Sequence, residues 1–497
     1  MLSVEELIKI RKVPYSDEQQ ARIKKAYQFA KEAHQGQKRA SGDDYFVHCV
    51  ETAKTLVQMG LGSITVSAAL LHDVYEDTEV SLEEIRKEFG REVAFIVEGV
   101  SKLSKVQLKG SDDDYYLSNL QKMFLAMAAD IRVILIKLAD RLHNMKTLSA
   151  LPREKQQRIA KETMEIFVPI ANRLGIGEVK GQLEDLCFKY LDPRNYQYVV
   201  NLRKKTHPLK EKYVDEVIKT LKKKLKEEDI DVIDVHGRVK HYYSLFNKLQ
   251  RYDNNIEKIY DLVAVRIVVP KVVDCYEALG VVHKNFRPLI GRIKDYISLP
   301  KPNGYKSIHT TIFAPQGKIV EVQIRTEKMH DEAEYGIAAH WIYDQNKKSG
   351  WRDLIFRDKY KPKVPDKEIS WVKQLKEWHR QSGGGTDEFW KSLKIDFFQN
   401  HIFVFTPNGD VVELPEGATP IDFAYKIHSD VGHRTSGVKV NGKMSALDTV
   451  LENGDLVEII TTKNKKLPSR DWLNFVKTAQ AKDRIKQILR KNGVEVV

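Results

Sequence analysis

Several features of secreted and membrane proteins are scarce or missing in this 497-residue sequence. It has only three cysteines, Cys49, Cys187 and Cys275, and because they form no CxxC pair we expect neither a disulfide framework nor a cysteine zinc site. No apolar run approaches the roughly 18 residues of a membrane span. The first residues lack the basic-then-apolar pattern of a signal peptide. We therefore expect a cytoplasmic protein with reduced, buried thiols.

The composition indicates a folded chain of several domains. Hydrophobic residues make up 42% and charged residues 30% of the sequence, which is typical of globular proteins. At roughly 100–200 residues per domain, about three or four domains are expected. The net charge of +13 favours polyanionic partners such as nucleotides and RNA, without choosing among them.

Hydrophobic patterning divides the chain into five stretches and predicts a multidomain α+β protein. Residues 1–195 carry apolar positions at helical spacing. Residues 196–345 mix short β-branched strands such as IVEVQIRT with helices, which predicts an α/β or α+β domain. Residues 346–395 are predicted to be a linker with one short helix. Residues 396–462, with hairpin turns at PNGD and VNGK, are predicted to form a small β-rich module, and the basic stretch 463–497 to begin a helical region.

Metal-type ligands gather in the segment LLHDVYEDTE. His72 and Asp73 are adjacent, and i, i+4 spacing on one helix would stack Glu76 on His72 and Asp77 on Asp73. These four polar groups would be costly to bury without a compensating ion. The segment favours a metal site, although an HD dipeptide alone is more often an exposed or capping pair.

Two further segments could complete this site. His48 lies in YFVHCVETAK, and Asp140 lies in KLADRLHNMKTL, where it shares a helix face with His143 and Asn144. Histidine nitrogen and carboxylate oxygen suit a divalent metal such as Mn²⁺ or Zn²⁺. Such a metal lowers the pKa of bound water and makes a nucleophile at neutral pH.

The segment GQKRASGDDYFVH places Arg39, Ser41 and Gly42 just before His48. A basic residue beside a metal site suits a phosphate-bearing substrate. Glu76 and Asp77 add a carboxylate pair that could position or deprotonate water.

A second group of polar residues lies in the mixed domain, although no GxxxxGK[ST] phosphate loop occurs in the chain. In GRVKHYYSLFNKLQR, Arg238 and Lys240 precede Ser244 and Lys248, and such cations could clamp a triphosphate. The next predicted strand begins at Asp261, a candidate Mg²⁺ ligand.

Two later segments complete this second group. Along EVQIRT, Val322 and Ile324 face one way, and Glu321, Gln323 and Arg325 face the other, as on the floor of an active site. The segment GRIKDYISLPKPNGYKSIHTTI adds Lys294, Lys301, Asn303, Tyr305 and His309. PNGY is a turn, so Tyr305 could stack on a nucleobase from a loop. A half-buried loop aromatic is the simpler interpretation of Tyr305 taken alone.

The set of His48, HDxxED and Asp140 resembles the HD metal-dependent phosphohydrolases. With GRIKDYI, PKPNGYKSIHTT, EVQIRT and AEYGIAAHW added, nearly the whole chain resembles the RelA/SpoT homologues, the stringent-response enzymes. The resemblance implies a synthetase that moves pyrophosphate from ATP to the 3′-hydroxyl of GDP or GTP. It also implies an Mn²⁺-dependent hydrolase that removes the 3′-pyrophosphate from (p)ppGpp.

The resemblance also assigns roles to residues of both sites. In the hydrolase it implies that Mn²⁺ is bound by His48, His72, Asp73 and Asp140. Glu76 and Asp77 would position or deprotonate the water, and Arg39 and Asn144 would contact the nucleotide. In the synthetase, Asp261 would hold Mg²⁺, Glu321 would orient or deprotonate the 3′-hydroxyl, and Tyr305 would stack on guanine. Phosphates would be held by Arg238, Lys240, Lys248, Lys294, Lys301 and His309, with Ser244, Asn303 and Gln323 nearby.

Other segments refine the expectation. The basic form Arg292-x-Lys294-Asp295 and the intact HDxxED resemble bifunctional members of the family, with GDP as a favoured acceptor. Residues 396–462 resemble the TGS domain, which implies contact with uncharged tRNA on the ribosome through His433; a surface-loop histidine is the alternative. The family continues with further C-terminal domains, so we expect a truncated or shortened form. Cys49 stands where the family usually has proline, and Ala40 where a basic residue is common.

Two alternatives remain open. One is a hydrolase whose synthetase half is silent, although Asp261 and Glu321 are both present. The other is a ribosome- or tRNA-binding regulator without catalysis, which the net charge of +13 and the TGS-like module suggest. Two complete catalytic sets argue against the second alternative, because a binding module has no need of metal-ligand spacing.

Overall fold

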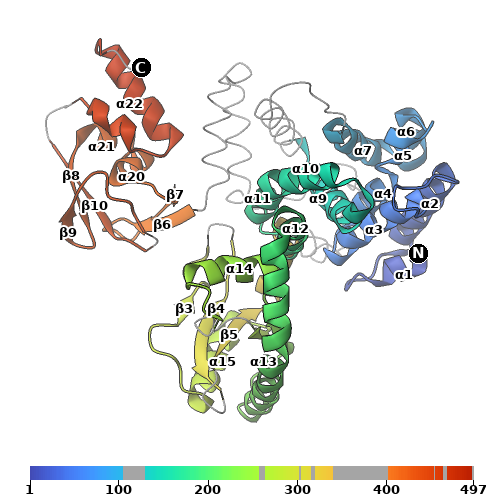
Figure 1. The fold of residues 1–497 in the computed structure, drawn as a ribbon, viewed down its shortest axis with the longest axis horizontal. Coiled ribbons are helices and arrows are strands. Elements are labelled where there is room, and N and C mark those ends of the chain that lie inside the picture. The colour runs from blue at the N-terminus through green and yellow to red at the C-terminus, as the bar shows by residue number, and fades with distance from the viewer. Residues whose placement is uncertain are drawn as a thin grey trace, which may run out of the picture. The chain divides into compact units, whose positions relative to one another are not determined.

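The computed structural model describes most of the chain as parts of two compact units, Met1–Lys376 and Glu377–Val497 (Figure 1). The described residues are 1–104, 129–256, 263–301, 304–314, 319–339, 401–452, 454–462 and 467–494. Asp261, Asn303 and the expected linker 346–395 with its short helix lie outside these ranges. Among the described residues, no helix is both long enough and apolar enough to cross a membrane.

The N-terminal region is helical, as predicted. Its helices are α1 (Val4–Lys9), α2 (Asp17–Ala33), α3 (Tyr45–Gln58), α4 (Ser63–Leu71), α5 (Val74–Asp77), α6 (Leu82–Phe89), α7 (Arg91–Ser104), α9 (Ile131–Lys146), α10 (Arg153–Glu162), α11 (Val168–Arg173) and α12 (Gly177–Leu191). Two short turns, η1 (Leu148–Ala150) and η2 (Thr163–Phe167), join α9 to α10 and α10 to α11. Serine capping boxes begin α1, α2 and α6, where each serine and the Glu or Gln three residues later bond to each other's backbone N–H groups.

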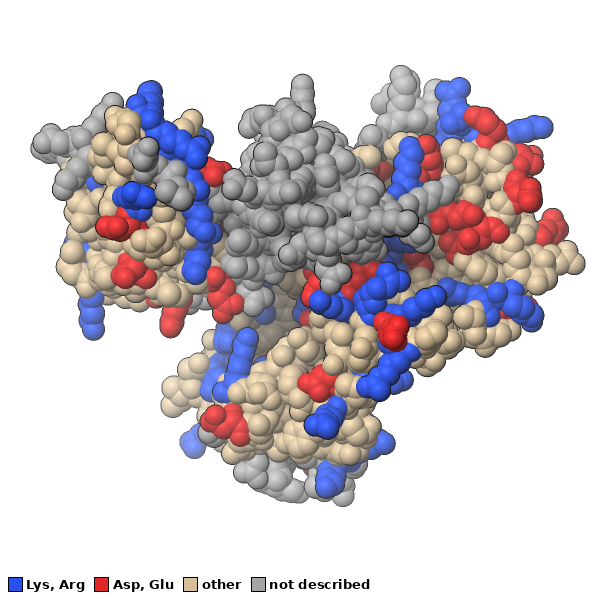
Figure 2. Space-filling model, turned by 45° about the horizontal axis from the view of Figure 1, so that its top comes forward, with Lys and Arg blue, Asp and Glu red and all other residues tan. Residues whose placement is uncertain are grey.

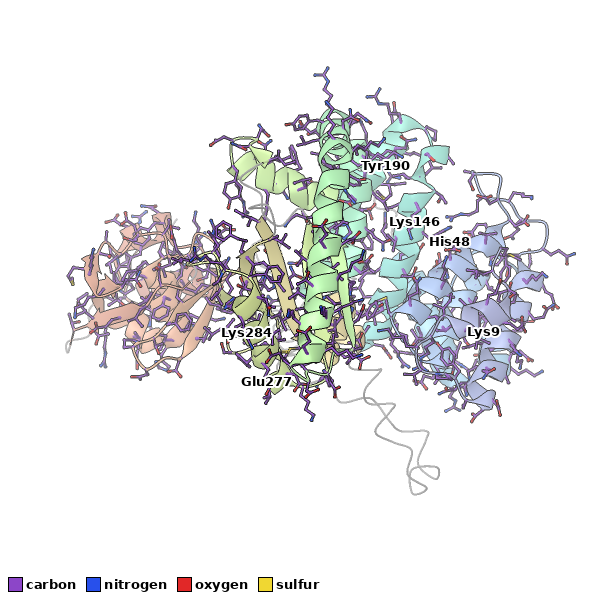
Figure 3. All side chains as sticks on the ribbon, turned by 90° about the horizontal axis from the view of Figure 1, so that it is seen from below. Lys9, His48, Lys146, Tyr190, Glu277 and Lys284 are labelled. Carbon is purple, nitrogen blue, oxygen red and sulfur yellow. The ribbon has the colours of Figure 1, made fainter. Side chains whose placement is uncertain are left out.

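Helix α4 is the centre of this region. Its residues SITVSAALL are almost all buried, which is typical of a helix that is apolar on every side. It packs against α2, α3, α7 and α9. In Figure 3, the labels of His48 and Lys146 mark the neighbouring helices α3 and α9.

The segment LLHDVYEDTE differs from the prediction of one continuous helix. Helix α4 ends at Leu71 and α5 starts at Val74, so that His72 caps the first helix and Asp73 the second. The His72 ring contributes to the break, because its Nδ1 lies 2.7 Å from the Ala69 carbonyl oxygen and competes for a backbone acceptor. The i, i+4 relationship survives in the backbone, where Asp77 N–H donates to the Asp73 carbonyl over 2.8 Å.

A five-stranded sheet of order β1-β2-β5-β4-β3 forms the middle region. Its strands are β1 (Asp234–Val239), β2 (Val263–Val269), β3 (Lys294–Asp295), β4 (Ile308–Phe313) and β5 (Ile319–Thr326), and only the β2–β5 pair is parallel. Helices α13 (Pro193–Glu227) and α15 (Val272–Asn285) cover one face (Figures 1 and 3). The core on that face includes Val322 and Ile324, which confirms the alternation predicted for EVQIRT.

Helix α12 joins the helical region to the sheet region. It packs against α9, α14 (Tyr242–Arg251) and α16 (Glu327–Tyr335). The contact is close, because Ile337 N–H donates to the Leu174 carbonyl over 3.0 Å. Gly336 permits this approach: its φ is +56°, and a Cβ there would lie 2.0 Å from the Leu174 oxygen.

The second unit is a small α+β module, in agreement with the β-grasp-like TGS prediction. Strands β6 (His401–Phe405) and β7 (Val411–Pro415) form the PNGD hairpin, and β8 (Thr435–Val440), β9 (Lys443–Ser445) and β10 (Val457–Thr461) form a sheet of order β10-β8-β9. The helices are α20 (Pro420–Ile427), α21 (Ser429–Arg434) and α22 (Ala479–Lys491), after the short turn η7 (Arg470–Asn474). The buried Asp422 carboxylate accepts hydrogen bonds from Thr419, Lys477 and Thr478, and so ties α20 to the start of α22.

The expectation for the thiols agrees with the structure, because Cys49, Cys187 and Cys275 are all buried and unpaired. Lysine and arginine side chains are visible on both units in Figure 2.

Candidate functional site

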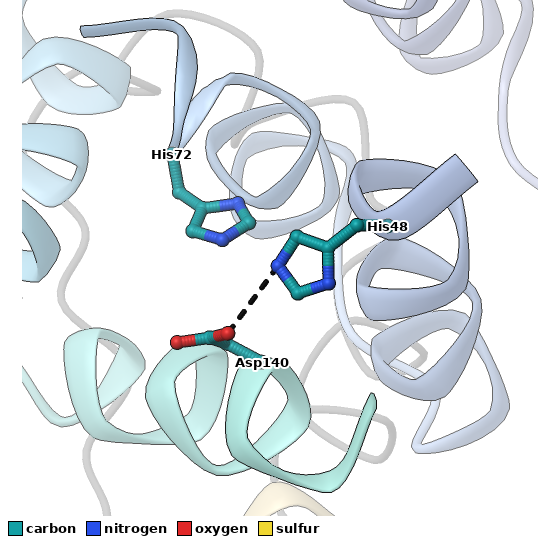
Figure 4. Close-up of side chains that lie close together, drawn as sticks. All are labelled: His48, His72 and Asp140. Atoms are coloured by element: carbon teal, nitrogen blue, oxygen red, sulfur yellow. Dashed lines mark ion pairs between the residues drawn. The ribbon is translucent and has the colours of Figure 1, made fainter. Parts of the chain in front are cut away.

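Four predicted metal ligands converge in the helical region. His48 on α3, His72 and Asp73 at the α4–α5 break and Asp140 on α9 are all buried. His48 Nε2 lies 3.3 Å from Asp73 Oδ2 and 3.3 Å from Asp140 Oδ1, and His72 Nε2 lies 3.1 Å from Asp73 Oδ1. Ligand atoms of His48, His72 and Asp140 are within 4.8 Å of one another (Figure 4).

The hydrogen bonds of the two histidines leave Nε2 as the ligand atom. His72 Nδ1–H donates to the Ala69 carbonyl, and His48 Nδ1 lies 2.8 Å from His143 Nδ1. In the neutral ring the other nitrogen then carries a lone pair. His72 Nε2 is buried and has no hydrogen-bond partner among the described residues.

This arrangement fits a bound cation. A lone pair facing carboxylate oxygens at hydrogen-bond distance is repulsive unless a positive charge lies between them. The site also favours positive charge on His48. Burial lowers the pKa of His48, but the Asp140 and Asp73 carboxylates outweigh burial and raise that pKa above its usual value. Two imidazole nitrogens and two carboxylates suit a divalent transition metal.

A ring of polar side chains holds Asp140 in place. Lys137 Nζ lies 2.6 Å from Asp140 Oδ2, and the Asn144 amide donates to Asp140 Oδ1. Burial favours the neutral acid, but the Lys137 charge outweighs it and holds the pKa of Asp140 well below its usual value. The Arg39 Nη2 donates to Asn144 Oδ1 over 2.6 Å, so the predicted nucleotide-binding pair lies beside the cluster.

The predicted water-handling carboxylates lie on α5. Asp77 Oδ2 accepts a 2.7 Å hydrogen bond from the Tyr45 hydroxyl, and Glu76 is half-buried next to it. Ser41 is exposed and donates to Asp43 over 2.8 Å, on the turn that follows Arg39.

Tyr45 and Lys137 of this site were not among the sequence-based candidates, and His143 was placed on the helix face of Asp140 but was given no role. Burial, followed by the His48 and Arg39 charges, lowers the pKa of His143 to about 3, so this ring is a neutral acceptor at physiological pH. Helical spacing was a usable signal, because Tyr45 precedes His48, and Lys137 precedes Asp140, by three residues.

The second group of candidates lies on the polar face of the sheet. In the strand register Lys294 pairs with His309, His309 with Gln323 and Gln323 with Arg266, so one row crosses four strands. His309 Nδ1 lies 3.2 Å from Glu321 Oε1, which also accepts from Gln323 Nε2 over 2.8 Å. The predicted catalytic carboxylate is therefore held by two neighbours on the same face.

A pocket of 260 Å³ opens beside this row. It is lined by four of the predicted nucleotide-binding residues: Arg238, Ser244, Lys301 and Tyr305. The Lys301 ammonium lies 5.0 Å from the centre of the Tyr305 ring, and the Tyr305 hydroxyl is 2.8 Å from His309 Nε2. Tyr305 is a half-buried loop aromatic, as the simpler interpretation predicts, and it lines the pocket; stacking on a nucleobase stays a prediction.

The remaining predicted lysines do not line this pocket. The Lys294 side chain is exposed, Lys248 is half-buried on α14, and Lys240 is half-buried between β1 and α14. Desolvation of its ammonium group, followed by the Lys294 charge, lowers the pKa of Lys301. These residues together make a strongly cationic site.

Two buried arginines were not predicted as site residues, although Arg325 was placed on the polar face. Arg266 Nη1 lies 2.8 Å, and Arg325 Nη2 3.2 Å, from Oε1 of Glu334 on α16. Arg266 Nη2 and Arg325 Nη1 have no hydrogen-bond partner among the described residues, and both residues line the pocket. Period-two alternation placed Arg325 on the polar face, but only the fold brings Arg266 and Glu334 to it.

His433 lies on α21 of the second unit and is half-buried. Its Nδ1 is 3.2 Å from the Tyr425 hydroxyl, and burial lowers its pKa. The ring is therefore oriented by a neighbour rather than free in a loop.

The fold and the two sites define a class of protein: a helical HD-type metal site followed in one chain by a mixed sheet with a cationic pocket. Comparison with known families agrees with each part. Residues 26–177 match the HD domain, residues 237–348 match the region found in RelA / SpoT proteins, and residues 402–461 match the TGS domain.

The chain belongs to the RelA/SpoT family. It is 46% identical over 478 residues to a GTP pyrophosphokinase of Myxococcus xanthus, covering 95% of this chain and 61% of the relative. It is 43% identical over 493 residues to a bifunctional (p)ppGpp synthase/hydrolase of Mycobacterium tuberculosis, covering 99% of this chain and 65% of the relative. A probable guanosine-3′,5′-bis(diphosphate) 3′-pyrophosphohydrolase of Synechocystis is 46% identical to it over 470 residues, covering 95% of this chain and 60% of the relative. The chain thus spans about six tenths of the length of these relatives.

Proposed function

We propose that this protein both makes and degrades (p)ppGpp, by transfer of pyrophosphate from ATP to the 3′-hydroxyl of GDP or GTP and by hydrolysis of the 3′-pyrophosphate. The observation that carries the proposal is that one chain holds two separate groups of polar side chains, each suited to one of the two reactions. One set is the buried cluster around His48 and Asp140, and the other is the cationic pocket beside Glu321. Relatives of both activities are similar to the chain.

In the hydrolase, His48, His72, Asp73 and Asp140 would hold Mn²⁺, which supplies a bound water of lowered pKa. Glu76 and Asp77 orient that water and take its proton. The Tyr45 hydroxyl fixes the Asp77 carboxylate for this task. Arg39 and Asn144 bind the nucleotide, because their mutual hydrogen bond places a cation beside the cluster.

In the synthetase, Glu321 orients the 3′-hydroxyl of the acceptor and accepts its proton. His309 and Gln323 hold the carboxylate in position for that step. Tyr305 stacks on the guanine base, and Ser244 lies beside the triphosphate. Phosphates are bound by Arg238, Lys240, Lys248, Lys294 and Lys301. Asp261, proposed to hold Mg²⁺, and Asn303 lie outside the described residues.

The partners follow from the same proposal. The TGS module binds the 3′ end of uncharged tRNA on the ribosome through His433, and the protein acts in the cytoplasm. The orientation of His433 by Tyr425 supports a specific contact. Loss of tRNA-stimulated synthesis in His433→Ala, with basal synthesis intact, tests this part.

One experiment tests the two activities. Purified protein is incubated with ATP, GDP and Mg²⁺, and separately with ppGpp and Mn²⁺, and the nucleotides are resolved by anion exchange. Product in both reactions is expected. Product in the second reaction only would favour a hydrolase with a silent synthetase half, and product in neither would favour a regulator that binds without catalysis.

A further inference from the structure

One carboxylate between the two catalytic regions has no role in the reactions proposed above. Asp185 lies on α12, and its Oδ1 accepts a 2.9 Å hydrogen bond from the backbone N–H of Tyr243. Its Oδ2 lies 3.0 Å from Nδ1 of His241. Both partners are at the start of α14. Tyr243 is 58 residues, and His241 56 residues, further along the chain than Asp185.

Helix α14 lacks a cap from its own sequence. Its N-cap residue is His241, whose side chain makes no capping hydrogen bond. The first N–H groups of a helix have no intrahelical partner, and a negative charge near them is favourable. Asp185 therefore does from a neighbouring helix what Ser, Thr, Asn or Asp at the N-cap normally does.

The capped end of α14 is part of the nucleotide pocket. His241 and Ser244 line the pocket with Arg238, Lys301 and Tyr305. Helix α12 also contributes Gly181, where a Cβ would lie 2.3 Å from His241 Nε2. Helix α12 thus determines the position of the imidazole in two ways. Asp185 holds Nδ1 by a hydrogen bond, and Gly181 leaves the space that Nε2 occupies.

We propose that Asp185 is a positioning residue for pyrophosphate transfer: it caps α14, orients His241, and so sets the position of Ser244 in the pocket. The proposal rests on the synthetase function proposed above. Asp185 itself contacts no reacting group; it acts through α14. Its place on α12 makes a helix of the hydrolase side part of the synthetase pocket.

Two substitutions separate the two contacts. Asp185→Ala removes both. Asp185→Asn keeps an oxygen for the Tyr243 N–H but turns an amide N–H group toward His241 Nδ1, which reverses the tautomer required of the ring. Asp192→Ala is the matched control, because Asp192 caps α13 through the Asn195 N–H over 3.2 Å and does not line the pocket.

The variants are tested in the full chain by hydrogen exchange of residues 242–251 and by steady-state kinetics of both reactions. Asp185→Ala is expected to speed exchange in α14 by about fivefold to tenfold, the fold-change that matches the usual stability loss from removing an N-cap, and to lower synthetase kcat/KM by up to the same factor. Asp185→Asn is expected to retain protection in α14 but to lose synthetase kcat. Hydrolysis of ppGpp should stay within about twofold of wild type in every variant, and Asp192→Ala should leave synthesis unchanged.

Unchanged exchange in Asp185→Ala would overturn the cap, and equal losses of synthesis and hydrolysis would replace positioning by general destabilisation. Wild-type behaviour of Asp185→Asn in both assays would remove the role of His241 orientation. If the wild-type chain makes no (p)ppGpp, the proposed synthetase function fails, and the positioning role of Asp185 in that reaction fails with it. The exchange data still decide whether Asp185 of α12 caps α14.

Discussion

Arg39 and Asn144 are 105 residues apart in the chain, yet a 2.6 Å hydrogen bond joins Arg39 Nη2 to Asn144 Oδ1. Asn144 in turn donates to Asp140, and Arg39 Nη1 lies 3.3 Å from His143 Nδ1. The guanidinium group is therefore tied to the metal cluster by two routes. A phosphate that reaches the cluster meets a cation whose orientation is already fixed.

This tie predicts that Arg39 and Asn144 act as a unit. Arg39→Ala and Asn144→Ala should each raise the KM of ppGpp hydrolysis, by an amount equivalent to about 1.5–3 kcal/mol for a charge-assisted hydrogen bond. The double variant should lose less than the sum of the two. Steady-state kinetics in a double-mutant cycle measure the coupling, and strict additivity would show that the two side chains contribute independently.

Metal removal should both stop hydrolysis and destabilise the helical region. Without a cation, His72 Nε2 and the carboxylates of Asp73 and Asp140 oppose one another in a buried space. Mn²⁺ at about 100 times its Kd should add about 2.7 kcal/mol to the free energy of unfolding by mass action. Calorimetry after chelation, and again after Mn²⁺ is restored, measures this change. Asp140→Asn serves as the comparison, since its melting temperature should respond less to Mn²⁺.

Glu321→Gln should abolish synthesis selectively. The amide oxygen can still accept from Gln323, so the fold of the sheet is retained, but the group can no longer take a proton from a hydroxyl. The expected loss of synthetase kcat is about 10²- to 10⁴-fold, the usual range for a general base. Hydrolysis of ppGpp in the same preparation is the control. A variant with normal pyrophosphate transfer would restrict Glu321 to a structural role.

The joint between α12 and α16 predicts a large difference between two glycine substitutions. Gly336→Ala should cost more than about 3 kcal/mol, because it places a Cβ 2.0 Å from the Leu174 oxygen at a φ of +56°. Gly291→Ala should cost only about 1–2 kcal/mol, because its φ is also positive, at +73°, but no atom lies within 4 Å of the new Cβ. Urea denaturation of both variants measures the difference, and equal midpoints would contradict the close backbone contact.

All three thiols should react slowly in the folded protein. Burial raises the pKa of Cys187 and of Cys275 to about 12, and that of Cys49 well above its usual value, so the thiolate is scarce at pH 8. Ellman's reagent should therefore titrate three cysteines promptly in guanidinium chloride and far more slowly in buffer. Rapid reaction of any thiol in buffer would identify a region that opens easily.

The order of the elements could be predicted from the sequence, and so could the grouping of the candidate ligands His48, His72 and Asp140, which the structure brings together. Period-two alternation placed Glu321 and Gln323 on one face of β5, and helical spacing grouped Asp140 with Asn144, because both patterns arise from local geometry. The break between His72 and Asp73 escaped prediction, since i, i+4 spacing in the sequence is identical in a continuous and an interrupted helix.

Contacts between distant segments were beyond the reach of the sequence. Glu334 carries no signal of its own as the partner of Arg266 and Arg325, and neither does Asp185 as a cap for α14. Such pairs exist only after α12 and α16 have packed on the sheet. Their residues were therefore found from the fold, whereas the candidate metal ligands were predicted from motifs.

The division of the sheet into an apolar face and a polar face has a consequence for how this protein can change during evolution. Val322 and Ile324 support the core, while Glu321 and Gln323, one position away, are hydrogen-bonded to each other on the opposite, polar face. Selection on nucleotide preference can therefore act on alternate residues of β5 with little penalty in folding. Under selection for protein abundance, Glu321 and Gln323 should tolerate random substitution better than Val322 and Ile324. Under selection for activity, both pairs should be sensitive.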